Sequence, residues 1–294
     1  MGRREEVEAW LTDMDGVLVH ENHALPGAAE LLQQWEDAGT PYLVLTNNSI
    51  FTARDLSARL RASGLNVPED RIWTSALATA DFLKQQLPGG TAFVIGEGGL
   101  LTALHQHGYA IVDHDPDYVV VGEGRTFNLE LVEAAVRMIL GGAKLVATNL
   151  DPNCPTKDGL RPGCGAMVAM LETATGVKAF SVGKPGAFMM RAARKELGLT
   201  TDQTTMIGDT MSTDILGGVQ LGFHTVLVLS GGTSRESLRG YAYQPELVVS
   251  SVAELHRILD AGDWEPWWLT KPQGARAVAP TKNAAAPARE KSVA

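Results

Sequence analysis

Cysteine is scarce in this chain of 294 residues, which has only Cys154 and Cys164. Two cysteines are too few for a disulfide framework, so reducing conditions are the simpler interpretation. Nothing near them in the sequence completes the four ligands of a structural zinc site. Long hydrophobic runs are also missing, since none approaches the roughly 20 residues that span a bilayer. The charged start, MGRREEVEAW, has no apolar stretch typical of a signal peptide. We therefore expect a cytoplasmic protein without membrane contact.

Positive charge is in deficit, because 25 Lys and Arg residues face 34 Asp and Glu residues, for a formal net charge of −9. Nucleic-acid polymers need a basic face, so binding to them is not expected. A small phosphorylated substrate stays compatible, since a site can be locally positive in an acidic protein. The stretch 271–294 is rich in Ala, Pro and Lys and poor in large apolar residues, which predicts a disordered tail.

Short β-rich runs alternate with amphipathic segments of helical length. This pattern predicts an α/β fold, with a mostly parallel, Rossmann-like sheet and helices on its faces. Eight runs are candidate strands: VEAWLTD ending at Asp13, and then 41–46, 71–75, 91–96, 117–122, 144–148, 204–209 and 224–230. Several end in Asp, Asn, Thr or Gly. Ligands of open α/β sheets bind beyond the carboxyl ends of the strands, so these polar residues are the site candidates.

The middle of the chain contains a weak internal repeat. The stretches 94–106 and 120–135 each predict a strand, a Gly-Glu-Gly turn and a helix. Leu101 and Phe127 stand where a dinucleotide fingerprint would have its third glycine, so tight turns are the simpler interpretation. The repeat predicts a small α/β unit of its own. We place an inserted cap domain at 85–178, between catalytic-core segments 1–84 and 179–270.

Two aspartates stand two residues apart at the end of the first predicted strand. Because strand side chains alternate, Asp13 and Asp15 would face one site while Met14 turns toward the core. Two carboxylates this close repel one another, and a divalent cation or a shared proton is the usual way to hold them together. Taken alone, the motif is equally compatible with a solvated Asp-x-Asp-Gly turn.

Polar residues also follow the second predicted strand, in the run Thr46-Asn47-Asn48-Ser49. Hydroxyl, amide and backbone N–H groups suit a phosphate, but such residues also cap helices, and a helix is expected near Thr52.

Two further clusters lie later in the chain. Lys184 precedes the predicted helix AFMMRAARKEL, at the mouth of a strand–helix turn. Asp209 ends the run Met206-Ile207-Gly208 and would emerge at a strand tip. Asp214 lies just before the next helix, where an acidic side chain also favours the helix dipole.

The order of the four motifs, Asp-x-Asp, Thr, Lys and Gly-Asp-x4-Asp, resembles that of the haloacid dehalogenase (HAD) superfamily of phosphohydrolases over about 11–259. The long insertion between the second and third motifs is similar to the inserted cap of subfamily IIA. The stretches DMDGVLVHENHALPGAAELL, TSALATADFL, GCGAM, VGKPGAFMMRAA and GDTMSTDILGGVQLG are similar to the NagD-type nucleotide and sugar phosphatases.

This resemblance implies a Mg²⁺-dependent phosphatase of small phosphomonoesters. Asp13 would attack phosphorus and form an aspartyl-phosphate, and Asp15 would protonate the leaving group and then activate water. The implied Mg²⁺ ligands are the carboxylates of Asp13 and Asp209 and the backbone carbonyl of Asp15. Asp214 would not bind the metal directly but would orient a metal-bound water or Lys184.

The resemblance also implies the substrate-binding residues. Lys184, Thr46 and the Asn47 backbone would hold the phosphate, with contacts from the loop of Thr210, Met211, Ser212 and Thr213. Candidates to touch the leaving group are Asn149, Asp151 and 162–165 in the cap. Nucleoside monophosphates are the first expected substrates and sugar phosphates the next. Pairing as a homodimer through the cap is a further expectation.

Three alternatives accompany this interpretation. A dehalogenase would need neither the acid Asp15 nor the metal ligand Asp209, so the presence of both counts against it. A phosphomutase needs the same groups and stays open, opposed only by the hydrolase-like cap. A non-catalytic phosphate sensor is disfavoured because every expected polar position is filled. His20 and His23 flank the first motif and are interpreted as surface residues rather than ligands.

Overall fold

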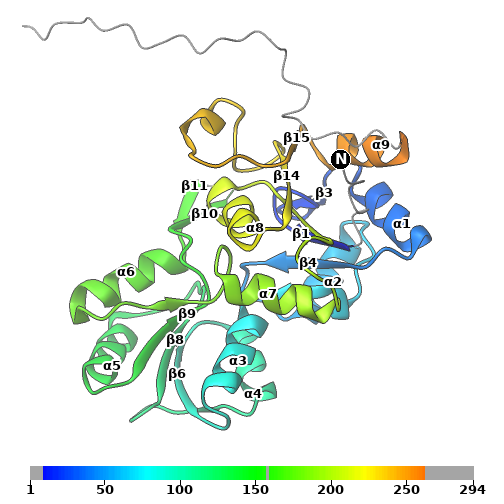
Figure 1. Cartoon of the computed structure of the whole chain (residues 1–294). Helices are drawn as coiled ribbons and strands as arrows, with labels where there is room; N and C mark the ends of the chain where they lie inside the picture. Colours follow the sequence, from blue (N-terminus) through cyan, green and yellow to red (C-terminus); the bar gives the residue numbers. More distant parts are fainter. Residues whose placement is uncertain (1–8, 157–158, 262–294) are drawn as a thin grey trace, which may run out of the picture.

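The structure is a computed structural model that describes residues 9–156 and 159–261. The predicted tail at 271–294 lies outside these residues. Two parallel sheets form the framework, and helices lie on the faces of both (Figure 1). Within the described ranges, no helix has both the length and the apolar character that crossing a bilayer requires.

The first sheet contains six parallel strands in the order β15-β14-β13-β1-β4-β5. Their bounds are β1 (Ala9–Asp13), β4 (Tyr42–Thr46), β5 (Ile72–Thr74), β13 (Thr204–Gly208), β14 (His224–Val228) and β15 (Leu247–Val249). Strand β1 lies between β13 and β4, so the residues that follow these three strands meet at one edge. This topology brings Asp13, Thr46 and Asp209 together from three distant parts of the chain.

The second sheet is also parallel, in the order β12-β9-β8-β6-β7. Its strands are β6 (Thr91–Ile95), β7 (Ala110–Ile111), β8 (Tyr118–Val121), β9 (Lys144–Ala147) and β12 (Phe180–Ser181). Strand β12 pairs with β9 although it lies beyond residue 178, where the sequence predicts the cap to end. Each of the eight predicted strands is present in one sheet or the other.

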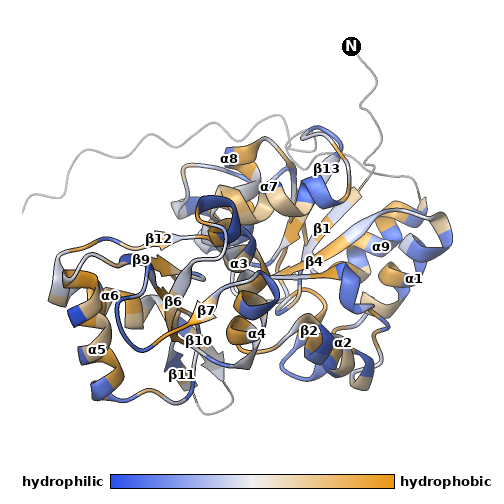
Figure 2. Cartoon of the chain, turned by 90° about the horizontal axis from the view of Figure 1, so that it is seen from below, coloured by the Kyte–Doolittle hydropathy of each residue, from blue (hydrophilic) through white to orange (hydrophobic). Residues whose placement is uncertain are grey.

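Neighbouring strand residues point to opposite faces of a sheet, and here both faces are apolar. Helices therefore cover both faces of each sheet. Trp10 packs in the cluster under α1 (Ala28–Ala38), α2 (Ala53–Ala62) and α9 (Val252–Ala261), whereas Leu11 packs toward α3 (Ser75–Gln86) and α7 (Ala187–Glu196). Strand β8 divides in the same way, since Val119 faces α5 (Leu129–Leu140) and α6 (Cys164–Thr175). Figure 2 shows the resulting pattern of mainly hydrophobic strands and two-sided helices.

One hydrophobic cluster joins the two sheets. Leu11 of the first sheet and Val120 of the second belong to it, together with Leu100 of α4 (Gly98–Gln106). The inserted unit therefore shares buried apolar surface with the core. The predicted fold class, an α/β core with a mostly parallel sheet and an inserted smaller α/β unit, is confirmed.

The remaining elements are short. Two antiparallel hairpins are formed by β2 (Val19–His20) with β3 (His23–Ala24) and by β10 (Asn153–Thr156) with β11 (Gly159–Pro162). The exposed His20 and His23 face each other across the first hairpin, as surface residues should. A π-helical turn, Met211–Ile215, leads into α8 (Leu216–Leu221). Single 3-10 turns occur at Glu69–Arg71 and Ser237–Gly240.

Candidate active site

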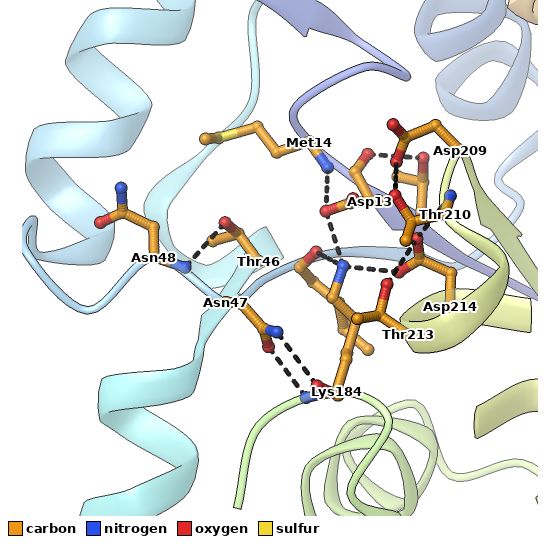
Figure 3. A network of polar contacts seen from close by, with 12 residues as sticks. Asp13, Met14, Thr46, Asn47, Asn48, Lys184, Asp209, Thr210, Thr213 and Asp214 are labelled. Carbon is orange, nitrogen blue, oxygen red and sulfur yellow. Dashed lines mark hydrogen bonds and ion pairs between the residues drawn. The ribbon is translucent and has the colours of Figure 1, made fainter. Parts of the chain in front are cut away.

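Three carboxylates and one ammonium gather at the carboxyl edge of the first sheet (Figure 3). Asp13 ends β1, Asp209 follows β13, and Asp214 lies in the π-helical turn. Their carboxylate oxygens come within 4.8 Å of one another. Lys184 reaches the same place from the loop between β12 and α7. The structure therefore brings together four of the predicted site residues, which are separated by up to 201 positions in the chain.

Lys184 is buried between two of these carboxylates. Its Nζ lies 2.7 Å from Asp13 Oδ1 and 2.7 Å from Asp214 Oδ1, and it donates to the Leu45 carbonyl at 3.2 Å. Its side chain is only 2% exposed. Burial alone would lower the pKa of this ammonium, but the two ion pairs outweigh that effect and raise it. Lys184 therefore carries a fixed positive charge beside Asp13.

Two contacts hold the Asp13 carboxylate in place at this edge. Its Oδ1 accepts a hydrogen bond from the backbone N–H of Met14 at 2.7 Å, in addition to the Lys184 contact. Burial raises its pKa well above the usual value, Lys184 lowers it, and the carboxylates of Asp214 and Asp209 raise it again. The opposing effects show that negative charge is concentrated here and that one lysine offsets only part of it.

Asp209 is held by the loop that follows β14. The Gly232 N–H donates to its Oδ2 at 2.5 Å, and the Thr210 hydroxyl donates to its Oδ1 at 3.2 Å. Gly16 approaches it closely, since a Cβ at that position would lie 2.4 Å from Asp209 Oδ2. Gly16 also has a left-handed φ of 79°, which a side chain would strain. Both constraints require glycine after the Asp-x-Asp pair.

Asp15 lies beyond the end of β1, with its side chain exposed, whereas Met14 is buried in the core as predicted. The protein packed around part of the Asp15 carboxylate disfavours its charged form and raises its pKa to about 6; Lys184 lowers the pKa and Asp209 raises it. Asp15 thus combines access to solvent with a pKa that suits proton transfer near neutral pH.

The loop after β4 is organised by its own side chains. Thr46 Oγ1 accepts from the Asn48 N–H at 3.1 Å, and Asn48 Oδ1 accepts from the N–H groups of Ile50 and Phe51. The helix cap is Thr52, which forms a reciprocal capping box with Asp55 at the start of α2. Capping therefore belongs to Thr52 and not to the polar run that precedes it.

Asn47 connects this loop to Lys184 and to the inserted unit. Its side-chain amide donates to Lys184 O at 3.0 Å and to Asp151 Oδ2 at 2.9 Å, while its Oδ1 accepts from Lys184 N at 2.8 Å. Its carbonyl accepts from Asn149 Nδ2 at 2.9 Å. The sequence indicated only a backbone role for Asn47. Its side-chain partners lie 104 and 137 residues away, so no local signal could reveal them.

The loop 210–213 divides between the site and the core. Thr210 donates to Asp209 and Asp214, and Thr213 donates to Asp214 Oδ2 at 3.3 Å. The Met211 side chain is fully buried in a separate hydrophobic cluster, whereas Ser212 is exposed. The Met211 side chain therefore packs against other residues of the protein and is not accessible to solvent.

Sequence reasoning assigned no role to Ser49, which is completely buried. Its Oγ accepts from the Glu123 N–H at 2.8 Å and from the Thr148 hydroxyl at 3.3 Å. Ser49 and Asn47 both lie in the loop after β4, and their hydrogen bonds connect the two sheets.

The comparisons with known proteins agree with this geometry. Residues 10–110 match the haloacid dehalogenase-like hydrolase family, and residues 181–255 match a second, HAD-hydrolase-like family. The chain is 48% identical to the dihydroxyacetone phosphatase of Corynebacterium glutamicum over 247 residues, which cover 84% of this chain and 90% of the relative. It is 42% identical to the ribonucleotide monophosphatase NagD of Escherichia coli, over 83% of this chain and 96% of that protein.

Solved structures show the same relationship. NagD from Escherichia coli superposes with a TM-score of 0.81 at 41% identity, over 85% of this chain and 98% of that one. The p-nitrophenyl phosphatase from Archaeoglobus fulgidus superposes with a TM-score of 0.82 at 35% identity, over 86% and 99%. The chain belongs to the haloacid dehalogenase-like hydrolases, and within them to the NagD-like phosphatases of subfamily IIA. Its activity is that of a phosphomonoester hydrolase.

Proposed function

We propose that this protein hydrolyses small phosphomonoesters through an aspartyl-phosphate on Asp13, with Mg²⁺ as cofactor. The observation that carries the proposal is the buried Lys184 ammonium, 2.7 Å from Asp13, next to the exposed Asp15. The ammonium favours the charged form of Asp13, which a nucleophile requires. It also supplies positive charge where a phosphate would approach.

The reaction takes place in two displacements. In the first, a carboxylate oxygen of Asp13 bonds to phosphorus, the ester P–O bond breaks, and protonated Asp15 gives its proton to the departing alkoxide. In the second, ionised Asp15 takes a proton from water, the water oxygen bonds to phosphorus, and the Asp13–phosphorus bond breaks to release inorganic phosphate. Thr46, the Asn47 backbone and Lys184 hold the phosphate oxygens during both displacements.

The residues present fit a divalent cation. Three carboxylates approach within 4.8 Å, and Lys184 contacts only two of them, so the cluster keeps an excess of negative charge. Oxygen atoms are the ligands that Mg²⁺ prefers. In this proposal the carboxylates of Asp13 and Asp209 and the carbonyl of Asp15 hold Mg²⁺, while Asp214 stays paired with Lys184. When bound, the ion reduces the repulsion between the nucleophile and the anionic phosphate.

Nucleoside monophosphates and sugar phosphates are the substrates proposed, because the relatives are named for activities on such compounds. NagD is named a ribonucleotide monophosphatase, and other relatives are named 5'-nucleotidase and acid sugar phosphatase. The net charge of −9 supports a small metabolite rather than a nucleic-acid polymer. We include a cytoplasmic location, indicated by two free cysteines, and a homodimer in the same proposal.

Phosphate release by the purified full-length chain tests the proposal. With Mg²⁺ we expect release from nucleoside monophosphates, sugar phosphates or p-nitrophenyl phosphate, loss of release with a chelator, and recovery on adding Mg²⁺. Acid quenching during turnover should leave one phosphoryl group on the peptide that contains Asp13. Release without a bisphosphate activator distinguishes a phosphatase from a phosphomutase. Full activity in the chelator would contradict the role of the metal, and an unmodified peptide would contradict the intermediate.

A further inference from the structure

A cavity of about 210 Å³ lies at the carboxyl edge of the second sheet. Its walls are the turn after β8, the hairpin of β10 and β11, and the first two turns of α6. Most of the lining is apolar and includes Phe127, Met167 and Met170. Two charged side chains, Glu123 and Arg161, also reach it. An apolar pocket with a few convergent polar groups is the usual form of a small-molecule site.

Glu123 is the charged group most firmly fixed in this cavity. Only 9% of it is exposed, and its N–H donates to the Ser49 hydroxyl of the loop after β4 at 2.8 Å. One carboxylate oxygen accepts a hydrogen bond from the Cys154 thiol at 3.3 Å. A thiol is a weak donor, so a hydroxyl or amino group of a ligand can replace it with a stronger bond.

Arg161 balances this carboxylate. Burial raises the pKa of Glu123 to about 6, the Cys154 hydrogen bond and the Arg161 charge lower it, and Asp151 and Asp15 raise it. Glu123 is thus mostly ionised at neutral pH and acts as an acceptor. The Arg161 Nε is buried and has no hydrogen-bond partner in the described part of the chain. A buried donor of this kind is costly unless a bound molecule satisfies it.

The cavity is linked by hydrogen bonds to the loop that carries the proposed phosphate ligands. Gly163 lines it, the nearby Gly165 N–H donates to the Asp151 carbonyl at 2.9 Å, and Asp151 Oδ2 accepts from Asn47 at 2.9 Å. Asp151 follows Asn149, whose side chain donates to the Asn47 carbonyl at 2.9 Å, so two residues of the inserted unit reach the phosphate loop. Ser49, which fixes Glu123, lies three residues after Thr46, a proposed phosphate ligand. A phosphomonoester with its phosphate at Lys184 would therefore extend its organic part from Asp15 toward Glu123.

We propose that this cavity binds the organic part of the substrate, and that Glu123 selects an uncharged group bearing hydroxyl or amino donors. The inference rests on the proposed function, because it assigns the leaving group of that reaction. The apolar wall accepts the carbon skeleton, and Glu123 accepts its hydrogen bonds. A leaving group with its own carboxylate is disfavoured, since it would meet Glu123 and Asp151 in a poorly solvated space.

Four substrates test this selection on the full-length chain. Uridine 5'-monophosphate and dihydroxyacetone phosphate carry hydroxyl groups on different skeletons, p-nitrophenyl phosphate carries no hydrogen-bond donor, and 2-phosphoglycolate carries a carboxylate. Their kcat/KM values are compared for the wild type, Glu123→Gln and a matched control, Glu133→Gln. Glu133 lies on α5 in the same unit, pairs only weakly with Arg137 at 4.0 Å, and is 59% exposed.

In Glu123→Gln we expect kcat/KM for at least one hydroxylated substrate to fall about tenfold relative to p-nitrophenyl phosphate, chiefly through KM, because the hydrogen bond to a charged carboxylate becomes a weaker bond to a neutral amide. The relative value for 2-phosphoglycolate should rise about fivefold, because a like charge is removed. Activity toward p-nitrophenyl phosphate reports that the variant is folded. Which hydroxylated substrate responds distinguishes a nucleoside from a triose as the occupant.

Unchanged ratios in Glu123→Gln, or an equal loss for all four substrates, would overturn the selection by Glu123 while leaving the proposed hydrolysis intact. A similar change in Glu133→Gln would also overturn it, because that residue does not line the cavity. If the wild type released phosphate from none of the four compounds, the proposed function would fail and this inference with it.

Discussion

The carboxyl edges of the two sheets face the same region but are built differently. At the first edge, charged groups touch: Lys184 lies 2.7 Å from both Asp13 and Asp214. At the second edge, Asn149 and Asp151 make hydrogen bonds to Asn47, and Glu123 lines a cavity. Close ion pairs hold reacting groups in a fixed geometry, whereas a cavity can accept different shapes. We infer that the first edge performs the chemistry and the second selects the substrate.

The two edges are joined by one short loop. Asn47 connects Lys184 to Asp151, and Ser49 connects Thr148 to the Glu123 backbone. Because both residues follow Thr46, a shift of this loop would move the phosphate site and the cavity wall together. Substitutions at the charged edge should have the largest effects, a substitution in the joining loop a smaller one, and a substitution at a helix cap the smallest.

Asp13→Asn should produce the largest effect, because it removes the proposed nucleophile while keeping the size of the side chain. We expect phosphate release to fall by at least about 10³-fold. Steady-state release with p-nitrophenyl phosphate measures it. Asp115→Asn is the matched control: Asp115 is exposed and has a φ of 45°, which asparagine also tolerates. Retention of most activity in Asp13→Asn would rule out the nucleophile.

Lys184→Met should lower both activity and stability, because it leaves Asp13 and the fully buried Asp214 without their cation. Breaking a buried ion pair costs about 3–5 kcal/mol of the free energy of unfolding. Adding Asp214→Asn to this variant should restore part of the stability, since it removes one uncompensated charge. Urea denaturation measures both changes, with the exposed Lys84→Met as control. Equal stability of Lys184→Met and wild type would refute the stabilising role of the pair.

Asn47→Ala should have an intermediate effect, because it removes the hydrogen bonds to Lys184 and Asp151 together. We expect about 1–3 kcal/mol less stability and about a tenfold fall in kcat/KM. Urea denaturation and phosphate release are measured in parallel. Asn22→Ala removes one exposed contact, with Arg59, and should change neither quantity measurably. A stability loss with unaltered kcat/KM would limit Asn47 to a structural role.

Thr52→Ala should have the smallest effect, because it affects only the capping box of α2. We expect about 1 kcal/mol less stability and unchanged kcat/KM. Thermal or urea denaturation measures the first quantity. Thr173→Ala, at an exposed position in the last turn of α6, removes a hydroxyl without removing a cap and should not destabilise the protein. If Thr52→Ala reduced kcat/KM strongly, the division between capping and phosphate binding in this loop would be wrong.

Much of the framework could be predicted from local sequence. Eight candidate strands match observed strands, because β-branched and apolar runs ending in small polar residues suit buried parallel strands. The short strand β15 and the two-residue strands β7 and β12 were missed, since they carry too little pattern. Strand β12 also joins the second sheet beyond residue 178, and only its pairing with Val146 and Ala147 reveals this.

The order of the motifs indicated Asp13, Lys184, Asp209 and Asp214, and all four meet in the structure. The sequence could not give the partners of these residues. Ser49 and Glu123 are 74 positions apart, and Asn47 and Lys184 are 137 positions apart. Polar residues of these types are common in turns, so their roles depend on contacts that local spacing does not encode.

The sequence by itself determined the reaction class of this protein. Asp-x-Asp before a glycine, followed by Thr, Lys and Gly-Asp-x4-Asp, lies at strand ends, and strand ends are where parallel sheets place their ligands. Only the tertiary structure decided which charges touch, and that Glu123 lines a cavity with Cys154 and Arg161. The physical reason is that strand periodicity is local, whereas burial and ion pairing depend on how distant segments pack.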